Sequence, residues 1–143
     1  QFVAGRNLHE VDHAMAGYEV VVTFAGATFD LPVLRQVFPR LAVPPVHIDL
    51  RWVLKRLGYT GGLKRIERRL GLARPEAVAD MGGWDAVRLW RAHLAGDAGA
   101  LPLLLAYNAE DVYNLQPLLD RAVGELAARE LGRVGLQPAG PAC

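Results

Sequence analysis

The side chains most able to take part in chemistry are those of Tyr107 and Asp111, which lie four residues apart in a segment rich in Leu and Ala. Residues four apart on a helix share one face, so the phenol and the carboxylate are expected to project to the same place. A second acid, Asp30, follows an apolar run at residues 20–24. Because Mg²⁺ and Mn²⁺ prefer oxygen ligands, two acids and a tyrosine predict a metal site.

Each of these residues also has a purely structural interpretation. Asp30 precedes Leu31 and Pro32, and an Asp in this position is a good helix cap. It also follows a predicted parallel strand, and open α/β sheets bind ligands beyond the carboxyl ends of their strands. Tyr107 could be a core residue with its hydroxyl at the surface, and Asp111 an exposed helix residue. The residues alone leave these alternatives open.

The segment 62–71 carries a different kind of candidate site. Apolar residues at spacings of three and four predict a helix with one buried stripe. The rest of its surface is basic, with Lys64, Arg65, Arg68 and Arg69. Such a face could follow a phosphate backbone, which makes Lys64, Arg65 and Arg68 candidate contacts to nucleic acid. The alternative is a solvated helix face, because the net charge of the whole chain is only +1.

Bulk properties and missing motifs exclude several classes of protein. A length of 143 residues with 52% apolar and 22% charged residues predicts one globular domain. The single cysteine, Cys143, excludes an intramolecular disulfide and favours a reducing compartment, with the cytoplasm expected. No apolar run of about 20 residues predicts a membrane span. The sequence also contains none of the patterns typical of zinc sites, P-loops, dinucleotide-binding loops or serine-hydrolase elbows.

The elements that must position the candidate residues follow from periodicity and caps. Val20, Val21 and Val22 predict a strand at residues 18–24, buried on both faces as in a parallel sheet. A short extended piece follows at 46–48, with Asp49 as the cap of the next helix. Pro117 is expected to kink or divide the last helix. Helices are expected at residues 7–16, 31–38, 50–57, 63–71, 85–94 and 101–131.

Together these segments resemble the YprB-like branch of the ribonuclease H-like superfamily, predicted 3′–5′ exonucleases of the DEDDy group. The resemblance covers residues 18–118, and its motifs lie at 21–32, 47–50, 62–71 and 107–112. It implies an α/β fold with a mixed central sheet flanked by helices. It also implies hydrolysis of phosphodiesters in DNA or RNA, with single-stranded nucleic acid as the partner and a two-metal site for Mg²⁺ or Mn²⁺. By this resemblance Asp30 and Asp111 hold the ions, and Tyr107 orients the attacking water.

The chain departs from this pattern at two positions. The first motif of the family, Asp-x-Glu on a strand, has no counterpart, and Ala25 stands where the second motif usually has Asn. We therefore expect the domain, residues 1–131, to lack its first strands and to come from a longer parent protein, with a flexible tail at 132–143. The alternative function is a catalytically degenerate or truncated domain that binds nucleic acid or acts as a scaffold. An Asp-x-Glu encoded upstream of Gln1 would favour the enzyme.

Overall fold

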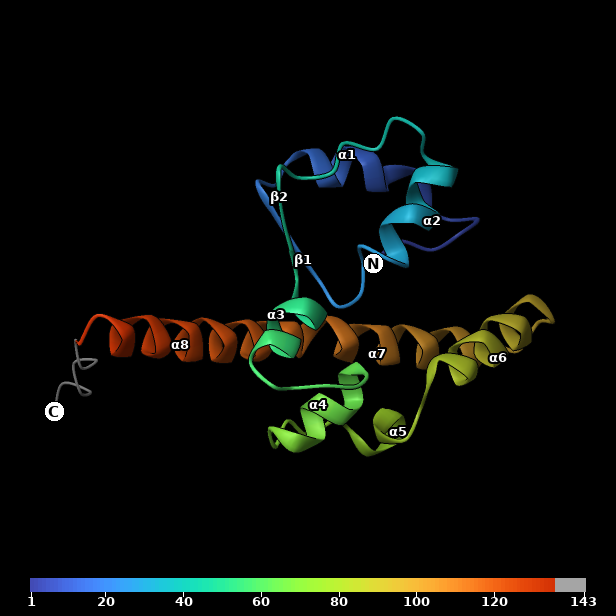
Figure 1. Ribbon diagram of the computed structural model, residues 1–143. Helices are drawn as coiled ribbons and strands as arrows, with labels where there is room; N and C mark the ends of the chain where they lie inside the picture. The colour runs from blue at the N-terminus through green and yellow to red at the C-terminus, as the bar shows by residue number, and fades with distance from the viewer. Residues whose placement is uncertain (136–143) are drawn as a thin grey trace, which may run out of the picture.

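The computed structural model describes residues 1–135, and its longest feature is a helical rod. Helices α7 (Ala100–Tyr113) and α8 (Leu115–Arg133) run nearly end to end (Figure 1). Pro117 lies in the first turn of α8, where its missing N–H is tolerated. The long helix expected at residues 101–131 is thus divided at Asn114, in agreement with the predicted effect of Pro117. The expected start of a flexible tail at residue 132 is wrong, because Gly132 and Arg133 belong to α8, and the rest of that tail lies, from residue 136 on, outside the described residues.

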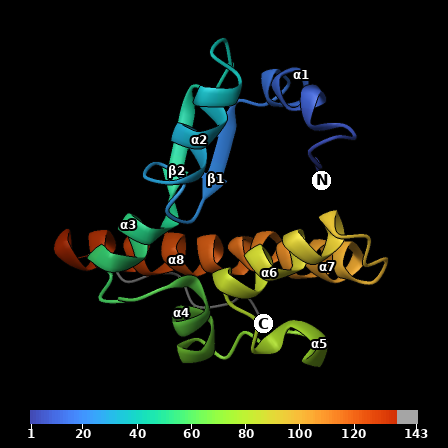
Figure 2. The same cartoon turned by 90° about the vertical axis from the view of Figure 1, so that its right-hand side faces the viewer.

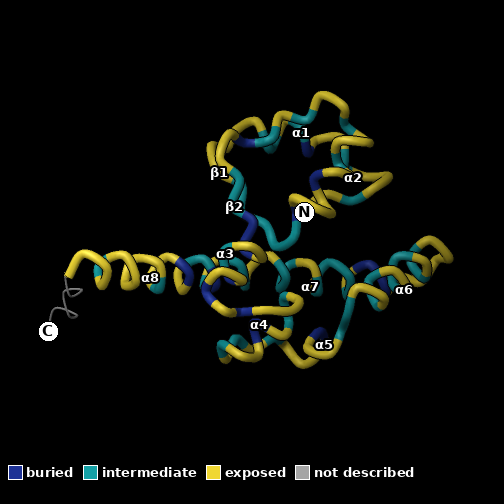
Figure 3. The backbone as a smooth tube through the Cα atoms, viewed as in Figure 1, coloured by how far each residue is buried: buried dark blue, intermediate teal, exposed yellow. Residues whose placement is uncertain are grey.

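A two-stranded parallel sheet stands on one side of the rod (Figure 2). Strand β1 (Val20–Thr23) pairs with β2 (Val46–Asp49), so that Val20 lies opposite Val46 and Thr23 opposite Asp49. The parallel pairing predicted from the valine run is confirmed. The expected burial on both faces is wrong, because Val20 is 45% exposed and the rest of β1 is half-buried (Figure 3). Two strands leave much of each face uncovered within residues 1–135.

The remaining helices lie on both sides of the rod (Figure 1). A 3₁₀ turn (Leu8–Glu10), α1 (Val11–Ala16) and α2 (Asp30–Val37) accompany the sheet, whereas α4 (Leu63–Arg69) and α5 (Glu76–Ala79) lie opposite. Helix α3 (Leu50–Arg56) follows β2 directly, and α6 (Gly83–Leu94) leads into α7. The sequence did not predict α5. Every helix within residues 1–135 is too short or too polar to cross a lipid bilayer.

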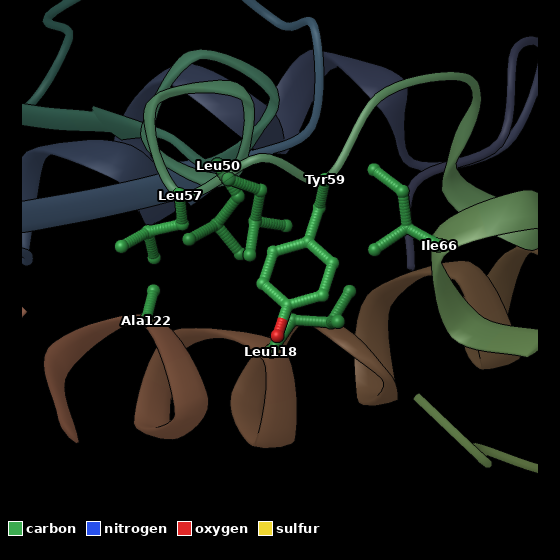
Figure 4. Close-up of a cluster of buried hydrophobic side chains, with 7 residues drawn as sticks. Leu50, Leu57, Tyr59, Ile66, Leu118 and Ala122 are labelled. Carbon is green, nitrogen blue, oxygen red and sulfur yellow. The ribbon is translucent and has the colours of Figure 1, made fainter. Parts of the chain in front are cut away.

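The core joins α3 and α4 to α8 (Figure 4). Leu50, Leu54 and Leu57 follow the helical spacing and point to one side, so α3 buries a continuous apolar stripe. Ile66 comes from α4, and Leu118 and Ala122 come from α8. Tyr59 lies among them with its hydroxyl directed toward α8, where it donates a hydrogen bond of 2.6 Å to Glu125.

The contacts of Glu125 predict a specific sensitivity to acid. The Tyr59 hydroxyl, and then Arg121 at 2.6 Å, lower the pKa of the Glu125 carboxyl below its ordinary value of 4.5. A carboxyl with a lowered folded-state pKa contributes stability that is present above its unfolded pKa and lost as the pH falls. The Glu125→Gln variant should therefore lose less stability than the parent when the pH drops below 4.5.

Thermal unfolding midpoints measured against pH would test this expectation. Glu130→Gln is the matched control, because Glu130 lies on the same helix and is exposed. Identical acid dependence in Glu125→Gln and the parent would show that the Tyr59 contact does not stabilise the folded state.

Candidate functional site

Tyr107 and Asp111 share one face of α7, as their spacing predicts, and both are half-buried. Burial raises the pKa of Tyr107 to about 12, and the charge of Asp111 and a hydrogen bond to its carboxylate act in the same direction. The phenol is therefore neutral at neutral pH, and its single O–H is directed to the Asp111 carboxylate. This face of α7 presents a carboxylate and a phenol coupled to each other.

The carboxylate of Asp111 is also paired with an arginine from a remote loop. Arg74 Nη2 lies 2.6 Å from Asp111 Oδ1 and 2.7 Å from Glu67 Oε1. Arg74 Nε donates a second bond of 2.8 Å to Glu67, and Asn114 adds a third of 3.0 Å. Glu67 is only 1% exposed. A buried guanidinium therefore bridges two carboxylates from different helices.

The electrostatics of this cluster keep Arg74 charged. Burial alone would lower the pKa of the guanidinium, but the hydrogen bonds and charges of Glu67 and Asp111 outweigh it and raise the pKa. The positive charge near Asp111 is thus supplied by a side chain of the protein itself. No sequence pattern marked Arg74 or Glu67 as part of the site, because the contact of Arg74 with Asp111 depends on how the loop after α4 packs against α7.

Lys64 occupies a different place from the one the sequence suggested. Its Nζ lies 4.7 Å from the centroid of the Tyr107 ring. That atom is buried and has no hydrogen-bond partner within residues 1–135. Burial lowers the pKa of Lys64, and the nearby charge of Arg74 lowers it further. The expectation that Lys64 lies on the exposed basic face is wrong, because this side of α4 packs against α7, whereas Arg65 and Arg68 are exposed.

Asp30 is the first residue of α2 and is not its cap. Phe29 occupies the N-cap position, and no side chain caps this helix, so the cap interpretation is wrong. The residue as a whole is exposed. Partial burial of the carboxyl raises the pKa of Asp30; a backbone hydrogen bond opposes the rise and the charge of Asp49 adds to it. Asp30 and Asp49 are therefore electrostatic neighbours.

Asp49 caps α3, as predicted, and also holds the loop that follows β1. Its side chain accepts from the backbone N–H of Arg51 at 3.1 Å, which confirms the cap. It also accepts from the N–H groups of Ala25 at 2.8 Å and Ala27 at 3.1 Å. The sequence carried a signal for this, because Asp49 ends a strand parallel to β1 and so lies beside the loop that follows β1. Asp49 fixes the loop that leads to Asp30.

The same loop contains an unusual backbone conformation. Ala25 has a φ of 65°, in the left-handed region that Asn tolerates better than Ala. The next residue, Gly26, has no room for a side chain, because a Cβ there would lie 2.5 Å from the side chain of Thr23. The turn after β1 is thus defined by Ala25, Gly26 and the Asp49 carboxylate.

A cleft brings Asp30 and Asp111 to one place, whereas Tyr107 is not among the residues that line it. The central cleft has a volume of about 1120 Å³ and lies between the β1–α2 region and the rod. Asp30 lines it from α2 and Asp111 from α7. Its polar and basic lining also includes Arg51, Thr23 and Asn108, whereas most of the remaining lining is apolar. Two segments remote in sequence therefore present a carboxylate each to the same space.

These residues do not by themselves complete a site for two divalent ions. Within residues 1–135, no three Asp, Glu, His or Cys side chains come together as metal ligands. The carboxylate of Asp111 is bonded to Arg74, and that of Asp49 to three backbone N–H groups. Asp30 and Asp111 have suitable oxygen donors for Mg²⁺ or Mn²⁺, but a complete set needs further ligands.

A comparison with known protein families identifies one family that matches most of the chain. The family model described as RNase H superfamily matches residues 4–123. Neither a curated protein nor a solved structure matches the chain significantly. The two parallel strands and their helices are consistent with an RNase H-like domain that lacks some of its strands. Because the matched region covers most of the chain, the protein belongs to the RNase H superfamily.

Proposed function

We propose that this domain acts in the 3′–5′ exonucleolytic cleavage of DNA or RNA, with the 3′ end of a single strand in the central cleft. Membership of the RNase H superfamily supports nuclease-like processing of nucleic acid. The observation that carries the proposal is that Asp30 and Asp111 line the same cleft, although α2 and α7 are far apart along the chain. Tyr107, one turn before Asp111, adds a neutral phenol beside that carboxylate.

The proposed cofactor is Mg²⁺ or Mn²⁺, with Asp30 and Asp111 as its ligands from this chain. RNase H-like domains generally use divalent metal ions. The described residues leave the set incomplete, so the activity requires further carboxylates, such as an Asp-x-Glu on an additional strand. Arg65 and Arg68 are exposed on α4 and are proposed to contact phosphates, whereas the Nζ of Lys64 is buried beside the Tyr107 ring.

Cleavage of an oligonucleotide labelled at its 5′ end by the full-length protein, with Mg²⁺ or Mn²⁺ present, tests this proposal. Asp111→Asn and Asp30→Asn should each reduce the rate by more than about 100-fold, because loss of groups that merely orient a metal ligand already costs about 10–100-fold. Asp120→Asn is the control, since Asp120 is exposed on α8, away from the cleft lining. Undiminished cleavage by Asp111→Asn would remove the role assigned to Asp111.

A second candidate is a module that binds nucleic acid without cleaving it. The bond between Arg74 and Asp111 favours this candidate, because it neutralises a proposed metal ligand with a side chain of the protein. A full-length wild-type protein that binds single strands but cleaves none of them with either ion would establish this second function and refute the first.

A further inference from the structure

A second groove lies on the surface of α3, beside the central cleft. Its volume is about 340 Å³. Phe24 and Arg51 line both spaces, so the two adjoin each other. The α3 groove is further lined by Trp52, Lys55 and Tyr59 and by the loop at residues 60–62. A chain leaving the central cleft past Arg51 would therefore enter this groove.

The groove combines an exposed aromatic ring with cations. Trp52 is 45% exposed and does not belong to the core that α3 forms with α4 and α8. The guanidinium carbon of Arg51 lies 5.8 Å from the centroid of the Trp52 ring, and Lys55 Nζ lies 5.3 Å from it. Proteins that bind single-stranded nucleic acid use this arrangement of an aromatic ring and cations. Bases stack on the ring, and phosphates pair with the cations.

The stretch of chain that contains most of the groove is strongly basic, although the whole chain is nearly neutral. Residues 51–69 contain seven Lys and Arg residues and a single acid, Glu67. Glu67 is buried and bonded to Arg74, so it does little to offset the charge at the surface. This local excess suits a polyanion, and its attraction depends on salt concentration.

We propose that the α3 groove binds a nucleotide of single-stranded DNA or RNA, with its base stacked on Trp52 and its phosphates on Arg51 and Lys55. The proposal rests on the proposed function, because the strand continues past Arg51 into the central cleft. A stacked base on an aromatic ring contributes more than an exposed cation–π contact. The base therefore displaces a cation from the ring, and that cation is free to pair with phosphate.

Fluorescence anisotropy of a short labelled oligo(dT) or oligo(U), measured in EDTA, tests the groove without any metal or cleavage. Trp52→Ala should raise the dissociation constant about 5- to 150-fold, the effect of removing one stacked base. Trp52→Phe should restore most of the affinity. Trp84→Ala is the matched control and should bind like the wild type, because Trp84 is 82% exposed on α6, outside the groove lining.

The cations are tested through the salt dependence of binding. Lys55→Gln should reduce the slope of log K against log salt by about 1, as loss of one phosphate contact does. Arg35→Gln, an exposed change on α2, should leave the slope unchanged. Binding to a duplex of the same sequence should depend little on Trp52, because paired bases cannot stack on it.

Equal affinities of Trp52→Ala and Trp84→Ala for the single strand would overturn the inference. It would also be overturned if the wild type did not bind at protein concentrations of about 100 µM, which is the weak end of non-specific binding. The binding experiments and the cleavage assay test the two proposals separately. A protein that binds through Trp52 in EDTA but never cleaves refutes only the exonuclease. A protein that cleaves but binds equally well without Trp52 refutes only the α3 groove.

Discussion

The Arg74→Met variant is expected to lose about 3–5 kcal/mol of the free energy of unfolding, the usual effect of breaking a buried ion pair on one side. The side chains of Arg74 and Glu67 are 4% and 2% exposed. Without the guanidinium, the Glu67 carboxylate keeps Asn114 as its donor among the described residues and remains close to the negative charge of Asp111. Methionine preserves much of the apolar volume, so the loss reflects charge.

Urea denaturation of the variant and two companions would measure this effect. Arg88→Met is the matched control, because Arg88 is 77% exposed and its pair with Asp85 lies at the surface. Such pairs contribute at most about 1 kcal/mol. The double variant Arg74→Met/Glu67→Leu should recover much of the loss, since it removes both buried charges. If Arg74→Met were no less stable than Arg88→Met, the buried pair would not hold α4 to α7.

The second large effect is expected from the core between α3 and α8. Leu118→Ala should lower the free energy of unfolding by about 2–5 kcal/mol, the range for a buried leucine truncated to alanine. Leu118 has no exposed surface and lies in the cluster formed by α3, α4 and α8 (Figure 4). Because α3 continues directly from β2, this contact also attaches the sheet to the rod.

Val123→Ala provides the comparison for Leu118→Ala. Val123 lies on the same helix but is 58% exposed, and substitutions at such positions usually change stability by less than about 0.5 kcal/mol. Unfolding followed by circular dichroism would report both values. Equal stabilities of the two variants would mean that α8 does not pack against α3 in solution.

Local sequence patterns predicted much of the secondary structure. The run Val20–Val22 identified β1 and its parallel pairing, and Asp49 identified the start of α3. Pro117 accounted for the division of the rod. These features depend on the preferences of neighbouring residues, which a single sequence contains. Helix α5 was missed because four residues give too short a periodic pattern to recognise.

Local sequence patterns predicted less of the candidate site than of the secondary structure. The spacing of Tyr107 and Asp111 placed them on one face of α7, because helical periodicity is local. Asp49 was recognised only as a cap, although its position at the end of a parallel strand also brought it close to the loop before Asp30. The bonds of Asp49 to Ala25 and Ala27 required the register of β1 against β2, which the sequence did not specify.

The sequence by itself determined the α/β class, the main helices and strands, and the shared face of Tyr107 and Asp111. Only the tertiary structure decided that Asp30 lines the same cleft as Asp111, that Arg74 forms an ion pair with Asp111, and that the Nζ of Lys64 is buried beside Tyr107. The physical reason is that these contacts join segments distant along the chain. They depend on which helix faces become buried against each other, and burial then sets the charge and the hydrogen bonds of each side chain.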